Sequence, residues 1–156
     1  MLLSRRSYER IRVSDITRKA RIGRATFYAH FASKNALLEA EIARVVLPML
    51  AADDRCLVDC TMLFAHVHHA RDIYRSLMGG KTQVVTERLI QDALEIRINE
   101  MLVAHLKWKT LTAEFVPRFV ASTLLTLLAW SLEQPTPPSP AALQAMFQSL
   151  VGRALA

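Results

Sequence analysis

The sequence predicts an all-α protein with a small head and a larger helical body, and three observations support this. Of 156 residues, 52% are hydrophobic, which is enough to form a sizeable core. Only four glycines and six prolines interrupt the chain, which favours helices over a many-turned β-protein. Apolar residues also recur near helical spacing along most of the sequence. We therefore expect eight or nine helices, with a head over residues 1–49, including a connecting helix, and a body over 50–156.

The excess of positive over negative charge lies at the start of the chain. Residues 1–34 hold nine basic and two acidic side chains, whereas the remaining 122 residues hold eleven basic and twelve acidic ones. The whole excess of the formal net charge of +6 therefore lies in the first fifth of the chain. A basic head on a neutral body suggests that a polyanion binds at one end. The alternative is a basic tail that serves solubility.

Two short helices and a turn are predicted in the head. Residues 13–20 form the first helix and residues 24–31 the second, with a turn between them in which Gly23 is the turn residue. Phe27 and Phe31 share one face of the second helix because they are four residues apart. The side facing the core would use six apolar residues: Val13, Ile16, Ala20, Ile22, Phe27 and Phe31.

The connecting helix and the body follow. Ser33 is a good N-cap for a helix from Lys34 to about Met49, and Pro48 marks or kinks its end. Asp53 and Asp54 are suited to a helix N-terminus, and no segment is a convincing strand. Helices are expected at 57–69, 70–78, 82–107, 112–133 and 141–155, with Gly79 and Gly80 closing the second of these and a stiff proline-rich linker at 135–140.

The chain shows no sign of membrane insertion or secretion. Its longest uncharged apolar stretch, residues 119–132, has fourteen residues, whereas a membrane span needs about 20. The first residues run directly into a basic segment, so no signal peptide is visible, and Cys56 and Cys60 do not suggest a disulfide framework. We expect a soluble cytoplasmic protein with no membrane partner.

Residues 13–31 meet the requirements of a helix-turn-helix, in which the second helix is exposed enough to enter the major groove. The outward side carries small, polar or cationic groups that can approach base edges and phosphates. The residues on the outward side are Ser14, Arg18, Arg24, Ala25, Thr26, Tyr28 and His30.

Residues 11–38, and above all the run Thr26-Phe-Tyr-x-His-Phe-x-x-Lys34 followed by two leucines, resemble the TetR/AcrR family of bacterial regulators. The resemblance is specific over about thirty residues and only architectural beyond them. It implies a three-helix head, a body with an effector pocket, and dimerisation through the last two long helices. It also implies a double-stranded, palindromic operator as partner and an unidentified small-molecule effector.

The resemblance also suggests roles for single residues. Arg24, Ala25 and Thr26 open the recognition helix and would face bases. Ser14 could reach a base or a phosphate, whereas Tyr28 and His30 would contact phosphates. Lys34, at a helix N-terminus, would add charge to a backbone contact with phosphate.

Two departures from the family pattern stand at the start of the chain. Arg12 occupies a position where the family usually has Thr or Ser as a cap, and it would meet a phosphate instead. The family's first helix normally precedes Leu2 and Leu3, so we expect only its last turn here. The alternative function is therefore a helical dimer, acting as an interaction protein or as a thiol or metal sensor, with impaired DNA binding.

The sequence bears on three further kinds of site: a metal site, an effector pocket and a catalytic site. The five Cys and His residues between 56 and 69 do not meet known zinc spacings, so no metal site is predicted. Residues that could line an effector pocket are Phe64, His68, Trp108, Phe119 and Trp130. The sequence has no phosphate loop, nucleophile elbow, HExxH or paired-carboxylate pattern, so no catalytic residue, cofactor or enzymatic activity is expected. The sequence predicts a ligand-responsive DNA-binding regulator, acting as a repressor that a small molecule releases from its operator.

Overall fold

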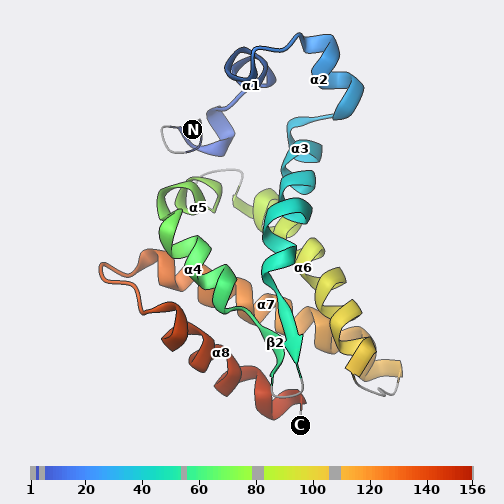
Figure 1. Ribbon diagram of the computed structural model, residues 1–156, viewed down its shortest axis with the longest axis vertical. Coiled ribbons are helices and arrows are strands. Elements are labelled where there is room, and N and C mark those ends of the chain that lie inside the picture. Colours follow the sequence, from blue (N-terminus) through green and yellow to red (C-terminus); the bar gives the residue numbers. More distant parts are fainter. Residues whose placement is uncertain (1–2, 4–5, 54–55, 79–82, 106–109, 156) are drawn as a thin grey trace.

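A computed structural model describes residues 3, 6–53, 56–78, 83–105 and 110–155, and within these ranges it confirms the all-α class. The helical head lies at one end of the molecule, and the connecting helix α3 leads from it into the body (Figure 1). The head contains a 3-10 turn η1 (Tyr8–Arg10) and the helices α1 (Val13–Ala20) and α2 (Arg24–His30), followed by α3 (Lys34–Glu41). The body contains α4 (Thr61–His69), α5 (Arg71–Leu77), α6 (Gln83–His105), α7 (Thr110–Glu133) and α8 (Pro140–Leu155).

The turn between α1 and α2 differs from the prediction. Arg21, not Gly23, adopts the left-handed conformation, with φ 57°, whereas Gly23 precedes α2 with φ −71°. The Ile22 N–H donates to the Thr17 carbonyl (3.0 Å) and the Arg21 N–H to that of Arg18 (3.3 Å). These two bonds form a Schellman-type helix end, in which the residue that follows the helix, here Arg21, takes the left-handed conformation. The position of Arg21 directly after α1 therefore accounts for its left-handed backbone conformation.

Two substitutions at this turn should show that the backbone strain lies at Arg21. An arginine in the left-handed region costs roughly 1 kcal/mol, a penalty that glycine avoids. Arg21→Gly should therefore raise the free energy of unfolding by up to about 1 kcal/mol. Gly23→Ala is the matched control: a Cβ there would meet only Thr26 Oγ1 at 3.6 Å, so a change within about 0.5 kcal/mol is expected. Urea unfolding of both variants measures this, and a destabilised Arg21→Gly protein would contradict the assignment.

The connecting helix reaches Met49 as predicted, but its hydrogen bonding changes along the way. After α3 come a π-turn η2 (Ile42–Val46) and a 3-10 turn η3 (Leu47–Met49). Pro48 has no N–H, so it cannot donate the bond that would continue the α-helix. The Leu47 N–H donates instead to the Ile42 carbonyl. The backbone hydrogen bonds thus change from an α-helical to a π-helical pattern just before the chain enters the body.

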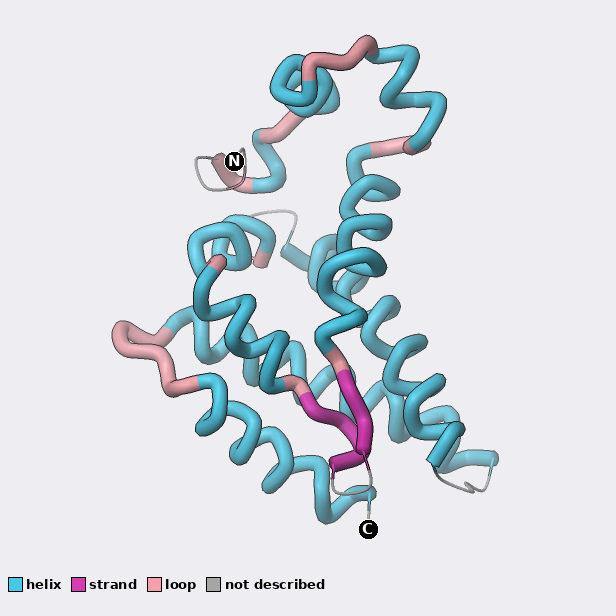
Figure 2. Tube along the Cα trace, viewed as in Figure 1, coloured by secondary structure: helices cyan, strands magenta, loops and turns pink. Residues whose placement is uncertain are grey.

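A short hairpin replaces the first part of a predicted helix. Residues 57–69 were expected to be helical, but β1 (Ala51–Asp53) pairs antiparallel with β2 (Cys56–Asp59), and α4 begins only at Thr61 (Figure 2). The expectation of no strand is therefore wrong here. Asp53 ends a strand, so it is not at a helix N-terminus, and Asp54 lies outside the described residues.

Side chains of α8 account for the hairpin. The Nε2 groups of Gln144 and Gln148 donate to the Val58 carbonyl at 3.3 and 2.8 Å, and the Cys60 N–H donates to Gln144 Oε1 at 2.9 Å. Asp59 Oδ1 accepts from the Thr61 N–H (2.8 Å) and starts α4. The backbone of β2 is thus satisfied by residues more than eighty positions away, which local periodicity cannot reveal.

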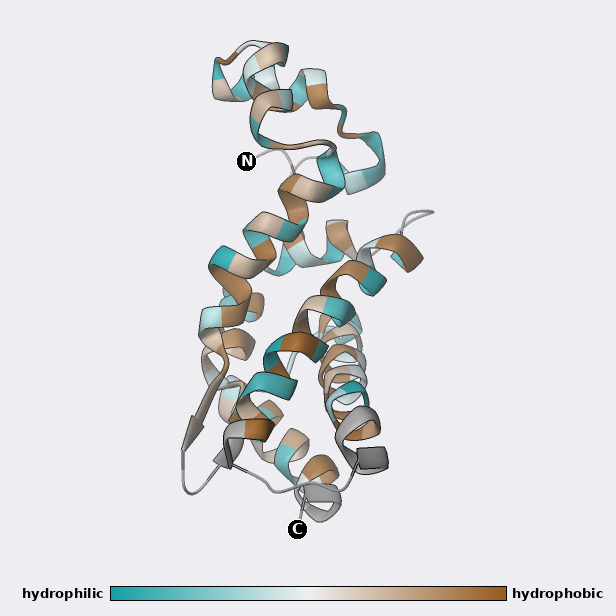
Figure 3. Cartoon of the chain, turned by 90° about the vertical axis from the view of Figure 1, so that its right-hand side faces the viewer, coloured by the Kyte–Doolittle hydropathy of each residue, from teal (hydrophilic) through white to brown (hydrophobic). Residues whose placement is uncertain are grey.

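The body core is built from the inner sides of α4, α6, α7 and α8. Figure 3 shows hydrophobic and hydrophilic residues mixed along the helices of the body. Its fully buried members include Phe64, Leu94, Leu124 and Phe147. The predicted helices at 82–107, 112–133 and 141–155 and the linker at 135–140 are confirmed within one to two residues where the structure describes them. The predicted helix at 70–78 is α5, while Gly79 and Gly80 lie outside the described residues.

Helix α7 is the most apolar of the three long helices α6, α7 and α8. By length and composition, Phe115–Glu133 could cross a membrane, and among the described residues it is the one helix that passes this test. However, 56% of this window is buried inside the fold, which is typical of a core helix.

Candidate DNA-binding surface

The second helix of the predicted motif presents nearly all of its side chains to solvent. Phe27 alone in α2 is buried, with 2% of its surface exposed, and its ring lies 5.3 Å from that of Tyr28 and 5.8 Å from that of Phe31. The remaining α2 residues are exposed: Arg24, Ala25, Thr26, Tyr28, Ala29 and His30. A single aromatic anchor thus holds α2 to the head and leaves its outer face free.

The head core is smaller than predicted. Val13, Ile16 and Phe31 are half-buried, but Ala20 and Ile22 are exposed although they were expected to face inward. Both lie at the turn, and the described segments of the head do not cover this side. Among the described residues that precede α3, the deeply buried apolar ones are instead Tyr8, Ile11 and Phe27.

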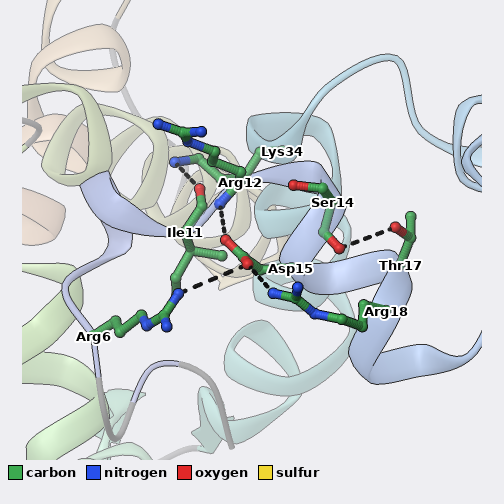
Figure 4. A network of polar contacts seen from close by, with 8 residues as sticks. All are labelled: Arg6, Ile11, Arg12, Ser14, Asp15, Thr17, Arg18 and Lys34. Atoms are coloured by element: carbon green, nitrogen blue, oxygen red, sulfur yellow. Dashed lines mark hydrogen bonds and ion pairs between the residues drawn. The ribbon is translucent and has the colours of Figure 1, made fainter.

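The start of α1 is held by a network of polar contacts (Figure 4). Arg12 is exposed and its backbone N–H donates to Asp15 Oδ2 at 3.0 Å, which gives half of a capping box. Asp15 Oδ1 also accepts from Arg18 Nη2 at 2.5 Å and lies 3.7 Å from Arg6 Nη1. The Arg12 side chain has no hydrogen-bond acceptor, so it cannot cap the backbone N–H groups at the start of α1. The capping bond is made instead by the carboxylate of Asp15, which accepts from the Arg12 N–H.

Asp15 is nearly buried, with 9% of its surface exposed, and it is charged at neutral pH. The Arg12 N–H is the main cause that holds the pKa of the Asp15 carboxyl below its usual range, with Arg18, Arg6 and Arg12 as nearby cations, while burial opposes the shift. Sequence reasoning missed Asp15, although an acid three residues after the N-cap position of a helix is a recognisable signal.

Lys34 and Ser14 are the two candidates that are half-buried. Lys34 Nζ donates to the carbonyls of Tyr8 (2.8 Å) and Ile11 (3.0 Å) and lies 4.1 Å from the centre of the Tyr8 ring. Burial lowers the pKa of the Lys34 ammonium, and the charge of Glu9 opposes this. The Ser14 carbonyl accepts from Thr17 Oγ1 at 3.3 Å. The ammonium of Lys34 is therefore directed into the head.

The candidate pocket residues do not lie together. Phe64 is fully buried against Phe147, His68 is exposed on α4, and Phe119 is half-buried and stacked on Phe115. Trp130 lines a shallow groove of about 390 Å³ between α6 and α7. Trp108 lies outside the described residues.

The cysteine and histidine cluster is also dispersed. Cys60 is fully buried, His66 lies edge-on to the ring of Tyr74 at 5.7 Å, and the side chain of Cys56 is outside the described residues. Within the described part of the chain, no group of three His, Cys, Asp or Glu residues is placed to hold a metal ion.

Two short helices joined by a tight turn, with the second exposed and cationic at its start, define a helix-turn-helix head. Residues 1–40 match the family described as "Bacterial regulatory proteins, tetR family", so the head of this chain is similar to the members of that family. The predicted resemblance is thereby confirmed.

One curated relative is the "Uncharacterized HTH-type transcriptional regulator YxbF" of Bacillus subtilis (strain 168). It is 50% identical to this chain over 44 residues, which are 28% of this chain and 12% of the relative. The match thus spans about an eighth of the relative's length. No solved structure matches the chain.

Proposed function

We propose that this protein is a dimeric, ligand-responsive transcriptional regulator that binds double-stranded DNA through α2 and is released from it by a small molecule. The observation that carries the proposal is the exposure of Arg24, Ala25, Thr26 and His30 on a helix anchored by the buried Phe27. The match of residues 1–40 to a family of regulators supports it.

On this proposal, α2 enters the major groove with Arg24 and Thr26 at base edges. Tyr28 and His30, farther along the helix, and Arg12, at the start of α1, contact phosphates and position the head. Selection of bound DNA from a random pool tests the proposal. A recovered palindromic site with half-sites about 34–36 Å apart is expected for a dimer, and recovery of no preferred sequence would contradict it.

Contacts between body and head offer a route by which an effector could act. Arg71 Nη2 donates to the carbonyls of Leu132 (2.9 Å) and Gln134, and Arg75 Nε donates to that of Leu132 (2.8 Å). Two guanidinium groups of α5 thus bind the C-terminal end of α7, which favours cations there. This end follows directly after Trp130, which lines the groove between α6 and α7.

The other end of this route reaches the head. Ser76 Oγ, one residue after Arg75, donates to the Arg6 carbonyl at 2.7 Å, and the guanidinium of Arg6 lies near Asp15 at the start of α1. Helix α5 therefore contacts both the end of α7 and the segment preceding α1. We propose that a small molecule in the groove displaces the end of α7 and moves the head through α5.

The coupling can be measured without knowing the effector. Arg75→Ala should shift the backbone amide signals of residues 6–15 in the wild-type background, and should shift them much less in a Ser76→Ala background, because the Ser76 hydroxyl completes the link. Arg97→Ala, which removes an exposed ion pair with Glu100 on α6, is the control and should leave the head signals in place. Equal shifts with and without Ser76 would show that α5 does not transmit the change.

A further inference from the structure

One peptide group at the start of the motif is bound by opposite charges at its two ends. The Ile11 carbonyl accepts from the Lys34 ammonium at 3.0 Å, and the Arg12 N–H donates to the Asp15 carboxylate at 3.0 Å. This carbonyl and this N–H belong to the same planar peptide unit, because Ile11 and Arg12 are consecutive. Figure 4 shows both contacts.

The Lys34 end of the arrangement is fixed by further contacts. Its ammonium also binds the Tyr8 carbonyl at 2.8 Å and lies over the Tyr8 ring, while the Tyr8 hydroxyl donates to Asn35 Oδ1 at 2.8 Å. Tyr8 is 6% exposed, so the ring and the ammonium shield each other from solvent. The first turn of α3 is thus fastened to the segment that precedes α1.

The Asp15 end is fixed by arginines. Arg18 binds the carboxylate from the same helix, and Arg6 approaches it from the preceding segment. Lys34 and Asp15 do not bind each other: the peptide group lies between them. Because the six atoms of a peptide unit are coplanar, holding both its oxygen and its N–H fixes its orientation. A cation on the oxygen and an anion on the N–H also polarise the group in the same direction, which strengthens both bonds.

We infer that Lys34 is a positioning residue: together with Asp15 it clamps the Ile11–Arg12 peptide group, sets the direction in which α1 leaves this segment relative to α3, and contacts no phosphate. This replaces the phosphate role suggested by family resemblance. The inference concerns the head itself, and only its second test below rests on the proposed function.

Hydrogen exchange of the full-length protein tests the clamp directly. Lys34→Met should speed exchange at the Arg12 amide by about tenfold or more, although Lys34 does not touch that N–H, since the loss of a charged hydrogen bond weakens its neighbour in the chain. The Phe31 amide, bonded to the Phe27 carbonyl at 2.9 Å, should keep its protection. Lys34→Arg, which keeps the charge, should restore part of the Arg12 protection, and Lys19→Met, which removes an exposed lysine of α1, should change neither amide.

An unchanged Arg12 amide in Lys34→Met would overturn the inference. Equal loss of protection at Arg12 and Phe31 would also overturn it, because Lys34 would then support the head in general and not this peptide group.

Binding to a random-sequence duplex of about 20 base pairs, measured over a range of salt concentrations, provides the second test. Lys34→Met should weaken binding with an unchanged salt slope, whereas Arg12→Met should lower the slope by about 0.9 for each phosphate that is no longer neutralised. A drop in slope for Lys34→Met equal to that of Arg12→Met would overturn the inference, since Lys34 would then release a counterion from a phosphate. If the wild-type protein bound no DNA at all, the proposed function would fail, while the exchange result would still decide the role of Lys34.

Discussion

Replacing Phe27 by alanine should unfold the head and abolish DNA binding while the body stays folded. The Phe27 ring is 2% exposed and anchors α2, a helix of only seven residues, against the rest of the head. Losing a buried phenyl ring costs about 3–5 kcal/mol. Among the described residues before α3, only Tyr8 and Ile11 are also deeply buried apolar residues, so little other burial offsets this loss. Hydrogen exchange of the amides of α1 and α2, beside those of α8, measures the effect.

Tyr28→Ala is the matched variant in the same helix. Its ring is 53% exposed and meets Phe27 only edge-on, so the head should remain protected against exchange. Its DNA affinity should nevertheless fall, because Tyr28 is assigned to a phosphate. If the head of Phe27→Ala stayed protected, the view that one aromatic residue anchors α2 would be wrong.

The second large effect is expected on assembly, at α8. No charged residue occurs from Pro140 to Gly152, and Met146 and Leu150 are 39% and 55% exposed on the same face, four residues apart. An uncharged, partly apolar face is costly to leave in water and is typical of helix–helix interfaces in dimers. We propose that this face, with α7, forms an isologous seam with a second copy of the chain.

Leu150→Asp should therefore raise the dissociation constant of the dimer by on the order of 100-fold or more, since burying an unpaired carboxylate costs several kcal/mol. Val103→Asp places the same charge on α6, at a side chain that is 64% exposed and outside the proposed seam, and should leave assembly unchanged. Sedimentation at micromolar concentration measures both variants. A wild-type monomer, or equal effects of the two substitutions, would contradict the proposed seam.

Local patterns were sufficient to predict most helices of the fold. Helices α6, α7 and α8 were predicted within one to two residues from their apolar spacing and from the prolines at 135–140. This was possible because the apolar residues that pack on the core recur at helical spacing within each helix. The hairpin could not be predicted in this way. Residues 57–59 have an apolar pattern compatible with a helix, but Gln144 and Gln148, far along the chain, provide hydrogen-bond donors for an extended backbone at Val58.

The candidate DNA surface was predicted in outline but not in its internal support. Periodicity correctly placed Phe27 inside and Arg24, Thr26 and Tyr28 outside. It could not show that Lys34 binds the carbonyls of Tyr8 and Ile11, because a lysine at a helix N-terminus is usually solvated, and only the fold brings residues 8–11 beneath it. The same is true of Arg21, whose left-handed conformation follows from the bonds that end α1.

The central claim is that α2 reads base edges in the major groove, and the most direct test is the affinity of Arg24→Ala for two duplexes, the selected site and a random sequence, each over a range of salt concentrations. Lys19→Ala, which removes an exposed cation of α1 that is assigned to no base, is the control. The proposal predicts that Arg24→Ala loses roughly 1–3 kcal/mol on the selected site, with relaxed preference at one or two base pairs and a much smaller loss on the random duplex. Equal losses on both duplexes, with the same salt slope as Lys19→Ala, would contradict the placement of α2 in the major groove.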